Sequence, residues 1–154
     1  MAEYNFNNWP VFSDEEIKRA SDILLSGKVN YWTGKETSQF EHEFAQAVGC
    51  KYGVAVTNGS VALELALRAK GVGKGHEVIV TPRSFFASAS SIMICGALPV
   101  FADVDLISQN ITAESIEKVI SENTKAVVCV HLSGWRCDMD LILNLYETYG
   151  FYVM

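Results

Sequence analysis

The residues best suited to bind an anion are Asn58, Gly59 and Ser60, which stand between an apolar run and an apolar helical stretch. Glycine permits a tight turn, and the first N–H groups of a helix have no acceptor within it and favour negative charge. The Ser60 hydroxyl can cap that helix or contact the same anion. The segment predicts either a phosphate site or an ordinary strand-to-helix cap, and taken alone it favours neither.

A second candidate is the aromatic pair Phe85 and Phe86, which follows the apolar run ending at Thr81 and opens another helical stretch. Ligands of parallel α/β sheets bind at the carboxyl ends of the strands. One ring could stack on a planar ligand there, or could pack the helix against the sheet. Arg83 could pair with a carboxylate or phosphate, or be solvated.

Candidate acid–base residues follow two further runs. His131 comes directly after the run 126–130, and a single histidine there is more often a hydrogen-bonded supporting group than a catalyst. Asp103 and Asp105 follow the run 99–101 and could act as paired carboxylates, although an end-of-strand turn is the simpler interpretation.

Two other patterns do not support a site. The glycines of Gly71-Val-Gly73-Lys-Gly75 follow a helical stretch and precede an apolar run, so they predict a helix end and not a Rossmann nucleotide fingerprint. The four cysteines and three histidines lack metal-site spacing, so we expect no metal and mostly buried, unpaired cysteines.

Short apolar runs alternate with longer amphipathic stretches along the chain, which predicts βαβ units in an α/β fold with three helix/sheet/helix layers. A capping box is predicted at Ser13 with Glu16. A helix N-cap is predicted at Thr112, with Ser115 in the first turn. The expected strands are 53–57, 78–81, 99–101, 126–130 and 151–154, and the expected helices 14–25, 38–48, 60–70 (buried), 86–95, 113–121 and 139–149.

The composition is that of a folded, acidic protein. Of 154 residues, 49% are hydrophobic and the net charge is -6, which excludes a disordered tail and disfavours nucleic-acid binding. No run approaches the roughly 18 apolar residues that span a bilayer, and the first residues lack signal-peptide character. We expect a cytoplasmic chain without nucleic-acid or membrane partners.

Taken in order, these segments resemble the DegT/DnrJ/EryC1/StrS family of sugar aminotransferases, which use pyridoxal 5'-phosphate (PLP). His76 stands where that family usually has Asp. The matching segments are Gly27 to Gly34, Phe40-Glu41-x-x-Phe44-Ala45, Asn58-Gly59-Ser60-x-Ala62-Leu63, Gly71-Val-Gly-x-Gly-x-Glu77-Val78-Ile79, Pro99-Val-Phe-x-Asp103-Val-Asp105 and Val130-His131-Leu132-x-Gly134.

The resemblance implies a truncated type I PLP-transferase (aspartate aminotransferase-like) large domain. Residues 1–50 would be an N-terminal helical segment and residues 51–154 the start of the mainly parallel sheet, with the rest of the large domain and the small domain absent. The chain ends inside the apolar run 151–154, which fits this expectation.

The resemblance also implies site residues. Gly59 and Ser60 would hold the cofactor phosphate, Phe86 would stack on the pyridine ring, and His131 would lie near the cofactor. The lysine that forms the Schiff base and the aspartate that pairs with the pyridine nitrogen would lie beyond Met154, so the chain alone is expected to be inactive. Tyr31, Trp32 and Thr33 would line a sugar pocket or form a packed loop.

The implied reaction moves an amino group from an amino acid, with glutamate the expected donor, to a keto group on a nucleotide-linked sugar. Its product would serve cell-surface polysaccharide or related glycoside synthesis, and the enzyme would be a homodimer. Two alternatives remain open: a PLP-dependent sugar dehydratase of the same family, in which histidine replaces the lysine, and a stand-alone non-catalytic binding module.

Overall fold

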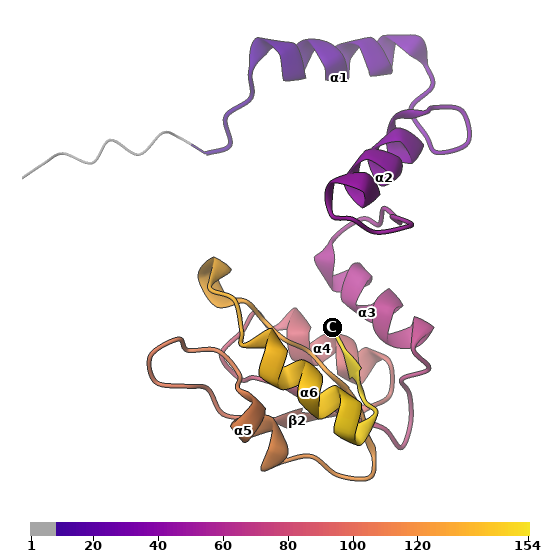
Figure 1. Cartoon of the computed structure of the whole chain (residues 1–154). Coiled ribbons are helices and arrows are strands. Elements are labelled where there is room, and N and C mark those ends of the chain that lie inside the picture. Colours follow the sequence, from indigo (N-terminus) through magenta and orange to yellow (C-terminus); the bar gives the residue numbers. More distant parts are fainter. Residues whose placement is uncertain (1–8) are drawn as a thin grey trace, which may run out of the picture. The chain divides into compact units, whose positions relative to one another are not determined.

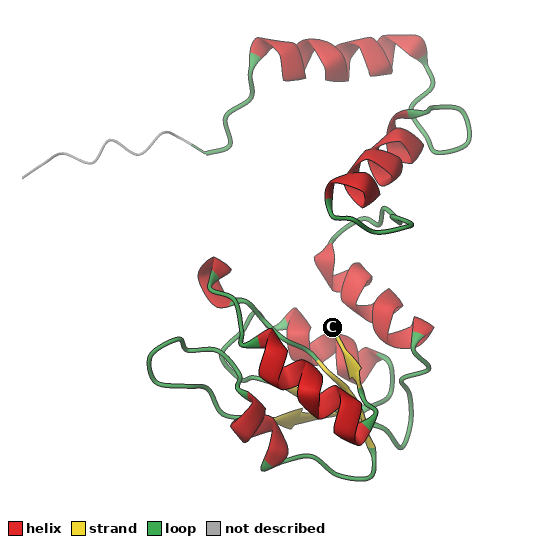
Figure 2. Ribbon diagram, in the orientation of Figure 1, coloured by secondary structure: helices red, strands yellow, loops and turns green. Residues whose placement is uncertain are grey.

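The computed structural model describes residues 9–154, which divide into two compact units (Figures 1 and 2). The first unit extends to Ala55 and the second runs from Val56 to Met154. No helix in the described residues is long and apolar enough to cross a bilayer.

The first unit holds two helices, α1 (Asp14–Ser26) and α2 (Glu36–Ala47). At the start of α1, the Ser13 side chain accepts a hydrogen bond from the Glu16 N–H, and the Glu16 carboxylate accepts one from the Ser13 N–H, at 3.3 and 2.7 Å. The predicted capping box is therefore confirmed.

The extended residues after α2 do not form the predicted strand 53–57, so that prediction is wrong. The Ala55 N–H donates to the Glu41 carboxylate over 2.8 Å, and a Cβ on Gly53 would lie 2.5 Å from the Glu41 carbonyl oxygen. A strand needs a neighbouring strand for its ladder of hydrogen bonds. Within the described residues, this segment is held by α2 instead.

The second unit contains a four-stranded parallel sheet in the order β2-β1-β3-β4. The four other predicted strands are present as β1 (Glu77–Val80), β2 (Leu98–Phe101), β3 (Thr124–Val127) and β4 (Tyr152–Val153). The helices of this unit are α3 (Gly59–Ala69), α4 (Ala87–Ile94), α5 (Ala113–Glu117) and α6 (Met139–Tyr149), with a 3-10 turn, η1, at Leu132–Gly134.

Two hydrophobic clusters show that helices cover both faces of the sheet. Val78 and Val80 pack with Leu67 of α3 and Ile92 of α4, whereas Ile79, between them, packs into the other cluster. That second cluster includes residues of α5 and α6. Successive strand residues point to opposite faces, so burial of all three strand residues requires two covering layers. The predicted three-layer α/β fold is confirmed.

Two helices differ from the prediction. The stretch 60–70 was expected to be buried, but of α3 only Leu67 is buried, while Val61 and Leu65 are 40% and 46% exposed. One face of α3 contacts the core, and the other has no cover within this unit. Helix α5 ends at Glu117 instead of residue 121. Thr112 is its N-cap, as predicted, and also forms a capping box with Ser115 that the sequence did not predict.

Candidate functional site

The carboxyl end of the sheet opens into a pocket of about 870 Å³ in the second unit. Three segments line it: the start of α3, the loop that leads into α4, and the loop after β3. The lining residues that bear on function are Asn58, Gly59, Ser60, Ser84, Phe85, Ser88, Val130, His131, Leu132 and Ser133.

The start of α3 is capped by Asn58 and not by Ser60, so the predicted capping role of Ser60 is wrong. Asn58 has an extended backbone with φ -167°, and its side-chain oxygen accepts the Val61 N–H at 3.0 Å. The first intrahelical bond runs from the Ala62 N–H to the Asn58 carbonyl at 3.1 Å. The N–H groups of Gly59 and Ser60 precede that bond and are available to a ligand.

The loop into α4 contributes hydroxyl groups and an aromatic ring. Thr81, buried at the end of β1, accepts a hydrogen bond from the Arg83 N–H at 3.2 Å. The hydroxyls of Ser84 and Ser88 are hydrogen-bonded to each other at 2.6 Å. Phe85 lines the pocket and is 78% exposed. Sequence reasoning missed both serines, because hydroxyls spaced by one helical turn occur in many helices.

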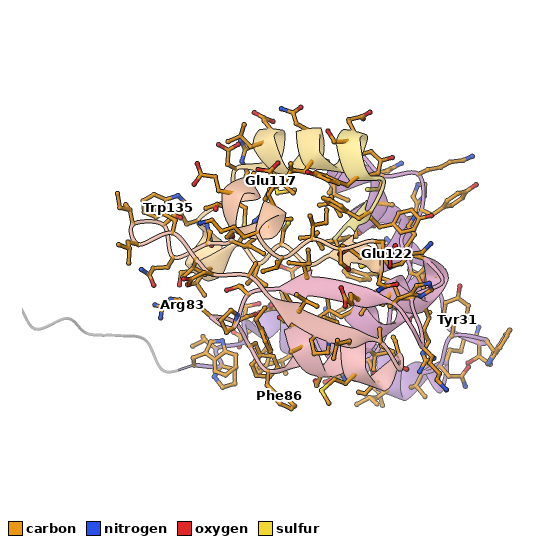
Figure 3. The ribbon with its side chains drawn as sticks, turned by 90° about the horizontal axis from the view of Figure 1, so that it is seen from below. Tyr31, Arg83, Phe86, Glu117, Glu122 and Trp135 are labelled. Atoms are coloured by element: carbon orange, nitrogen blue, oxygen red, sulfur yellow. The ribbon has the colours of Figure 1, made fainter. Side chains whose placement is uncertain are left out.

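Phe86, to which the family resemblance gives the stacking role, is the N-cap residue of α4 and is also 78% exposed. It is not among the residues that line the pocket, whereas its neighbour Phe85 is. Figure 3 labels Phe86 and Arg83 on the segment that leads into α4. Arg83 is exposed, which is the simpler of its two predicted states. The stacking role of Phe86 stays a prediction.

The loop after β3 brings His131 to the pocket. The Nδ1 atom of His131 accepts a hydrogen bond from the Cys137 N–H at 3.2 Å. In the neutral ring Nε2 then carries the proton and can donate to a ligand. His131 is hydrogen-bonded, as expected, and its place near a cofactor stays a prediction.

The pocket suits a negatively charged ligand. Both α3 and α4 begin at it, and the N-terminus of a helix carries a partial positive charge. Among the described residues that line the pocket, none is acidic. A Cβ placed on Gly59 would meet no atom within 4 Å, so the space beside its Cα atom is open. Main-chain donors, hydroxyls and an aromatic ring match a phosphorylated aromatic molecule such as PLP.

The other acidic candidates belong to a turn. The Asp105 carboxylate accepts hydrogen bonds from the N–H groups of Ser108 and Ile107, at 2.6 and 3.0 Å. The bond from Ser108, followed by that from Ile107, holds the pKa of Asp105 below its usual range. This geometry agrees with the end-of-strand turn and gives Asp103 and Asp105 no paired acid–base role.

The predicted sugar-binding residues lie in the first unit. The Asn30 side-chain oxygen accepts the N–H groups of Trp32 and Thr33, at 3.0 and 3.1 Å, and the Tyr31 hydroxyl donates to Glu41 at 3.3 Å. Trp32 is 91% exposed, so this is not a packed loop. The substrate role of Tyr31, Trp32 and Thr33 stays a prediction.

The described residues hold no cluster of metal-ligating side chains. All four cysteines are free thiols, and Cys95 and Cys137 are buried. Burial raises the pKa of Cys129 to about 12. These groups therefore contribute to packing, as the sequence predicts for most of them, although Cys50 is exposed.

A family model described as "DegT/DnrJ/EryC1/StrS aminotransferase family" matches residues 10–154. The chain belongs to this family. Among its curated relatives is spore coat polysaccharide biosynthesis protein SpsC of Bacillus subtilis (strain 168), 44% identical over 94% of this chain and 37% of the relative. GDP-perosamine synthase of Vibrio cholerae is 39% identical over 94% of this chain and 39% of the relative.

Solved structures of aminotransferases share the fold. One, from Psychrobacter cryohalolentis, is 52% identical with a TM-score of 0.95, over 97% of this chain and 38% of that one. The PLP-form of the putative sugar aminotransferase Spr1654 from Streptococcus pneumoniae is 32% identical with a TM-score of 0.86, over 93% of this chain and 36% of that one. The chain thus spans less than two-fifths of the length of the curated relatives it matches.

Proposed function

We propose that this chain is the N-terminal part of a PLP-dependent aminotransferase. The enzyme would transfer an amino group from glutamate to a keto group on a nucleotide-linked sugar. The observation that carries the proposal is the pocket at the start of α3, which Gly59 and Ser60 line ahead of the first intrahelical hydrogen bond and which has no acidic residue among its described lining residues. The family's description as aminotransferases supports the reaction. The name of one relative, GDP-perosamine synthase, supports the substrate class.

Each lining segment has a distinct task in this proposal. The N–H groups of Gly59 and Ser60 and the Ser60 hydroxyl bind the phosphate, because they are donors at a positive helix end. An aromatic ring at the start of α4, Phe86 by family resemblance or Phe85 by its place in the pocket, stacks on the pyridine ring. His131 donates from Nε2 to a polar group of the ligand.

When bound, PLP supplies an electron sink that stabilises negative charge at the carbon carrying the amino group. The chain's own residues bind and orient it, and they keep its phosphate at a fixed helix end. No lysine lines the pocket among the described residues. We therefore propose that the catalytic lysine, and the carboxylate that pairs with the pyridine nitrogen, lie outside these 154 residues, which alone would be inactive.

The remaining parts of the proposal concern substrates and assembly. Aromatic side chains suit the apolar face of a sugar, so Tyr31, Trp32 and Thr33 would contact the sugar of the nucleotide-linked substrate. The product would serve polysaccharide synthesis, as the name of the relative SpsC suggests for that protein. We propose a homodimer that acts in the cytoplasm.

The test uses the full-length protein and measures the dissociation constant of PLP. Ser60→Asp places a carboxylate where the phosphate would bind, so we expect affinity to fall at least roughly tenfold, since like charges in a desolvated site repel by more than 1 kcal/mol. Ser38→Asp is the matched control, because it adds the same charge in the first turn of α2 at a residue that does not line the pocket. Unchanged affinity in Ser60→Asp would contradict the phosphate site.

A second arm separates the two aromatic candidates and the two reactions. Phe85→Ala and Phe86→Ala form a matched pair, and the one that stacks on the cofactor should lose roughly tenfold in affinity, whereas the other should lose little. Transfer of ¹⁵N from labelled glutamate to the sugar would establish transamination. Loss of water from the sugar without transfer of ¹⁵N would show the dehydratase alternative instead.

A further inference from the structure

A buried asparagine contacts the loop after β3 that lines the pocket. It is not among the candidate residues predicted from the sequence. Asn110 is 2% exposed. Its side-chain amide donates to the Trp135 carbonyl at 2.7 Å, and its side-chain oxygen accepts the Leu132 N–H at 3.1 Å. These bonds join residues 22 and 25 positions apart in sequence and span both ends of the turn η1 (Leu132–Gly134).

The backbone of Asn110 is itself fixed, so the side chain acts as a rigid support. The Asp105 N–H donates to the Asn110 carbonyl at 2.9 Å. The next residue, Ile111, forms a bridge with Val104 and is 1% exposed in the second hydrophobic cluster.

The turn that Asn110 spans has an unfavourable backbone. Ser133 has φ 53° and Gly134 has φ 81°, so two consecutive residues are left-handed. A side chain with a Cβ rarely adopts this region unless surrounding contacts enforce it. In the described structure, Asn110 contacts the residues on either side of this pair, Leu132 and Trp135.

The same turn sets what the pocket presents to a ligand. His131 precedes the turn, Ser133 lies within it, and both line the pocket. The His131 ring is oriented by the Cys137 N–H, which comes from the far side of the turn. A change in the turn would therefore move the ring and the Ser133 hydroxyl together.

We infer that Asn110 is a positioning residue: by bridging Leu132 and Trp135 it holds the left-handed turn that places His131 and Ser133 at the pocket. The inference rests on the proposed function only for the identity of the ligand. Asn110 itself does not line this pocket.

The test compares four variants of the full-length protein. Asn110→Asp keeps the size and the acceptor, but it sets a carboxylate oxygen against the Trp135 carbonyl. Gly134→Ala perturbs the turn without touching Asn110, since an added Cβ meets no atom within 4 Å and the cost lies in the backbone. Ser133→Gly relieves the left-handed strain. Ile116→Val, on the buried face of α5, is the control for a simple loss of stability.

Hydrogen exchange and NMR report on the turn without any cofactor. Asn110→Asp loses the hydrogen bond to the Trp135 carbonyl, and Gly134→Ala strains the left-handed backbone of the turn. In both variants the turn should open more often, so we expect the Leu132 and Cys137 amides to exchange roughly tenfold faster. The ¹⁵N signals of the His131 ring should change from a single tautomer protonated at Nε2 to a mixture. Ser133→Gly combined with Asn110→Asp should restore part of the protection, and Ile116→Val should alter neither signal.

The consequence for binding is a roughly tenfold loss of PLP affinity in Asn110→Asp and Gly134→Ala, compared with Ile116→Val. The inference is overturned if the turn amides exchange no faster than in Ile116→Val, or if the turn loosens and affinity does not change. A native protein that binds no PLP would overturn the proposed function instead. Exchange and ring NMR would then still decide the role of Asn110.

Discussion

The two units use similar apolar patterns with opposite results. In the first unit Phe40, Phe44 and Val48 form a stripe with helical spacing, yet each is 54% exposed, and Ala45 is the one described residue of this unit in the core. In the second unit the apolar helix α6 buries Ile142 and Leu145 against the sheet. An apolar helix face stabilises a fold only where a second element covers it.

The pocket and the loop with Tyr31 and Trp32 differ in what holds them in place. The pocket is built by elements that share the buried sheet, so its N–H groups and hydroxyls are held in place by a core. The loop with Tyr31 and Trp32 is held by hydrogen bonds within its own unit. The proposed cofactor-binding residues are therefore preorganised by this chain, whereas the expected sugar-binding residues are supported locally.

The largest expected difference between the units is in thiol reactivity. Burial raises the pKa of the Cys129 thiol to about 12, so at pH 8 roughly one Cys129 side chain in ten thousand is ionised. Because the thiolate is the reactive form, Cys129 should react with an alkylating reagent at least about a thousandfold more slowly than exposed Cys50. Labelling followed by mass spectrometry measures both rates. Comparable rates would mean that the surroundings of Cys129 do not raise its pKa in solution.

The same shift predicts a pH dependence of stability. In the folded protein the pKa of Cys129 is raised above the usual thiol value of 9.0, so its contribution to stability is complete below about pH 9 and is lost as the pH rises toward 12. The unfolded chain ionises in this range and the folded chain does not. Cys129→Ala should reduce the fall in the free energy of unfolding.

The second largest difference between the units should be in the free energy of unfolding that is lost when an apolar helix residue is truncated. Ile142→Ala removes a side chain with no exposed surface, so we expect the free energy of unfolding to fall by about 2–5 kcal/mol. Phe40→Ala, at a half-exposed site of the first unit, should cost about 0.5 kcal/mol or less. Denaturant titration measures both, and equal losses would show that the stripe of α2 is covered in solution.

Removal of a helix cap should change stability least, and the two units offer capping boxes of the same type for this comparison. Thr112→Ala removes the cap of α5 in the second unit, and we expect about 1 kcal/mol less stability in the main unfolding transition. Ser13→Ala removes the same type of cap from α1 and should reduce helicity without moving that transition. Thr112→Ser and Ser13→Thr should behave like the native protein. A shift of the main transition in Ser13→Ala would show that the two units unfold together.

Local features of the fold could be predicted from the sequence. The capping box at Ser13 and the N-cap at Thr112 are confirmed because their partners are three residues away. The strands are confirmed where β-branched residues such as Val78 to Val80 are buried on both faces. The segment 53–57 has a similar composition but no strand partner in the described residues, and the sequence contains no signal for that.

Parts of the site depend on long-range contacts and could not be predicted. Asn58 and Ser60 are both good capping residues, and the extended backbone of Asn58 decides between them. Phe85 and Phe86 are adjacent, so a shift of one residue in the start of α4 changes which ring lines the pocket. Asn110 contacts a loop more than 20 residues away, and a buried asparagine has no local sequence signal.

The central claim is that the start of α3 binds the phosphate of PLP, and a crystal structure of the full-length protein with PLP tests it most directly. The account predicts phosphate oxygens within hydrogen-bond distance of the Gly59 and Ser60 N–H groups, with an aromatic ring from the start of α4 against the pyridine. A phosphate bound elsewhere, with these N–H groups covered by side chains, would contradict it.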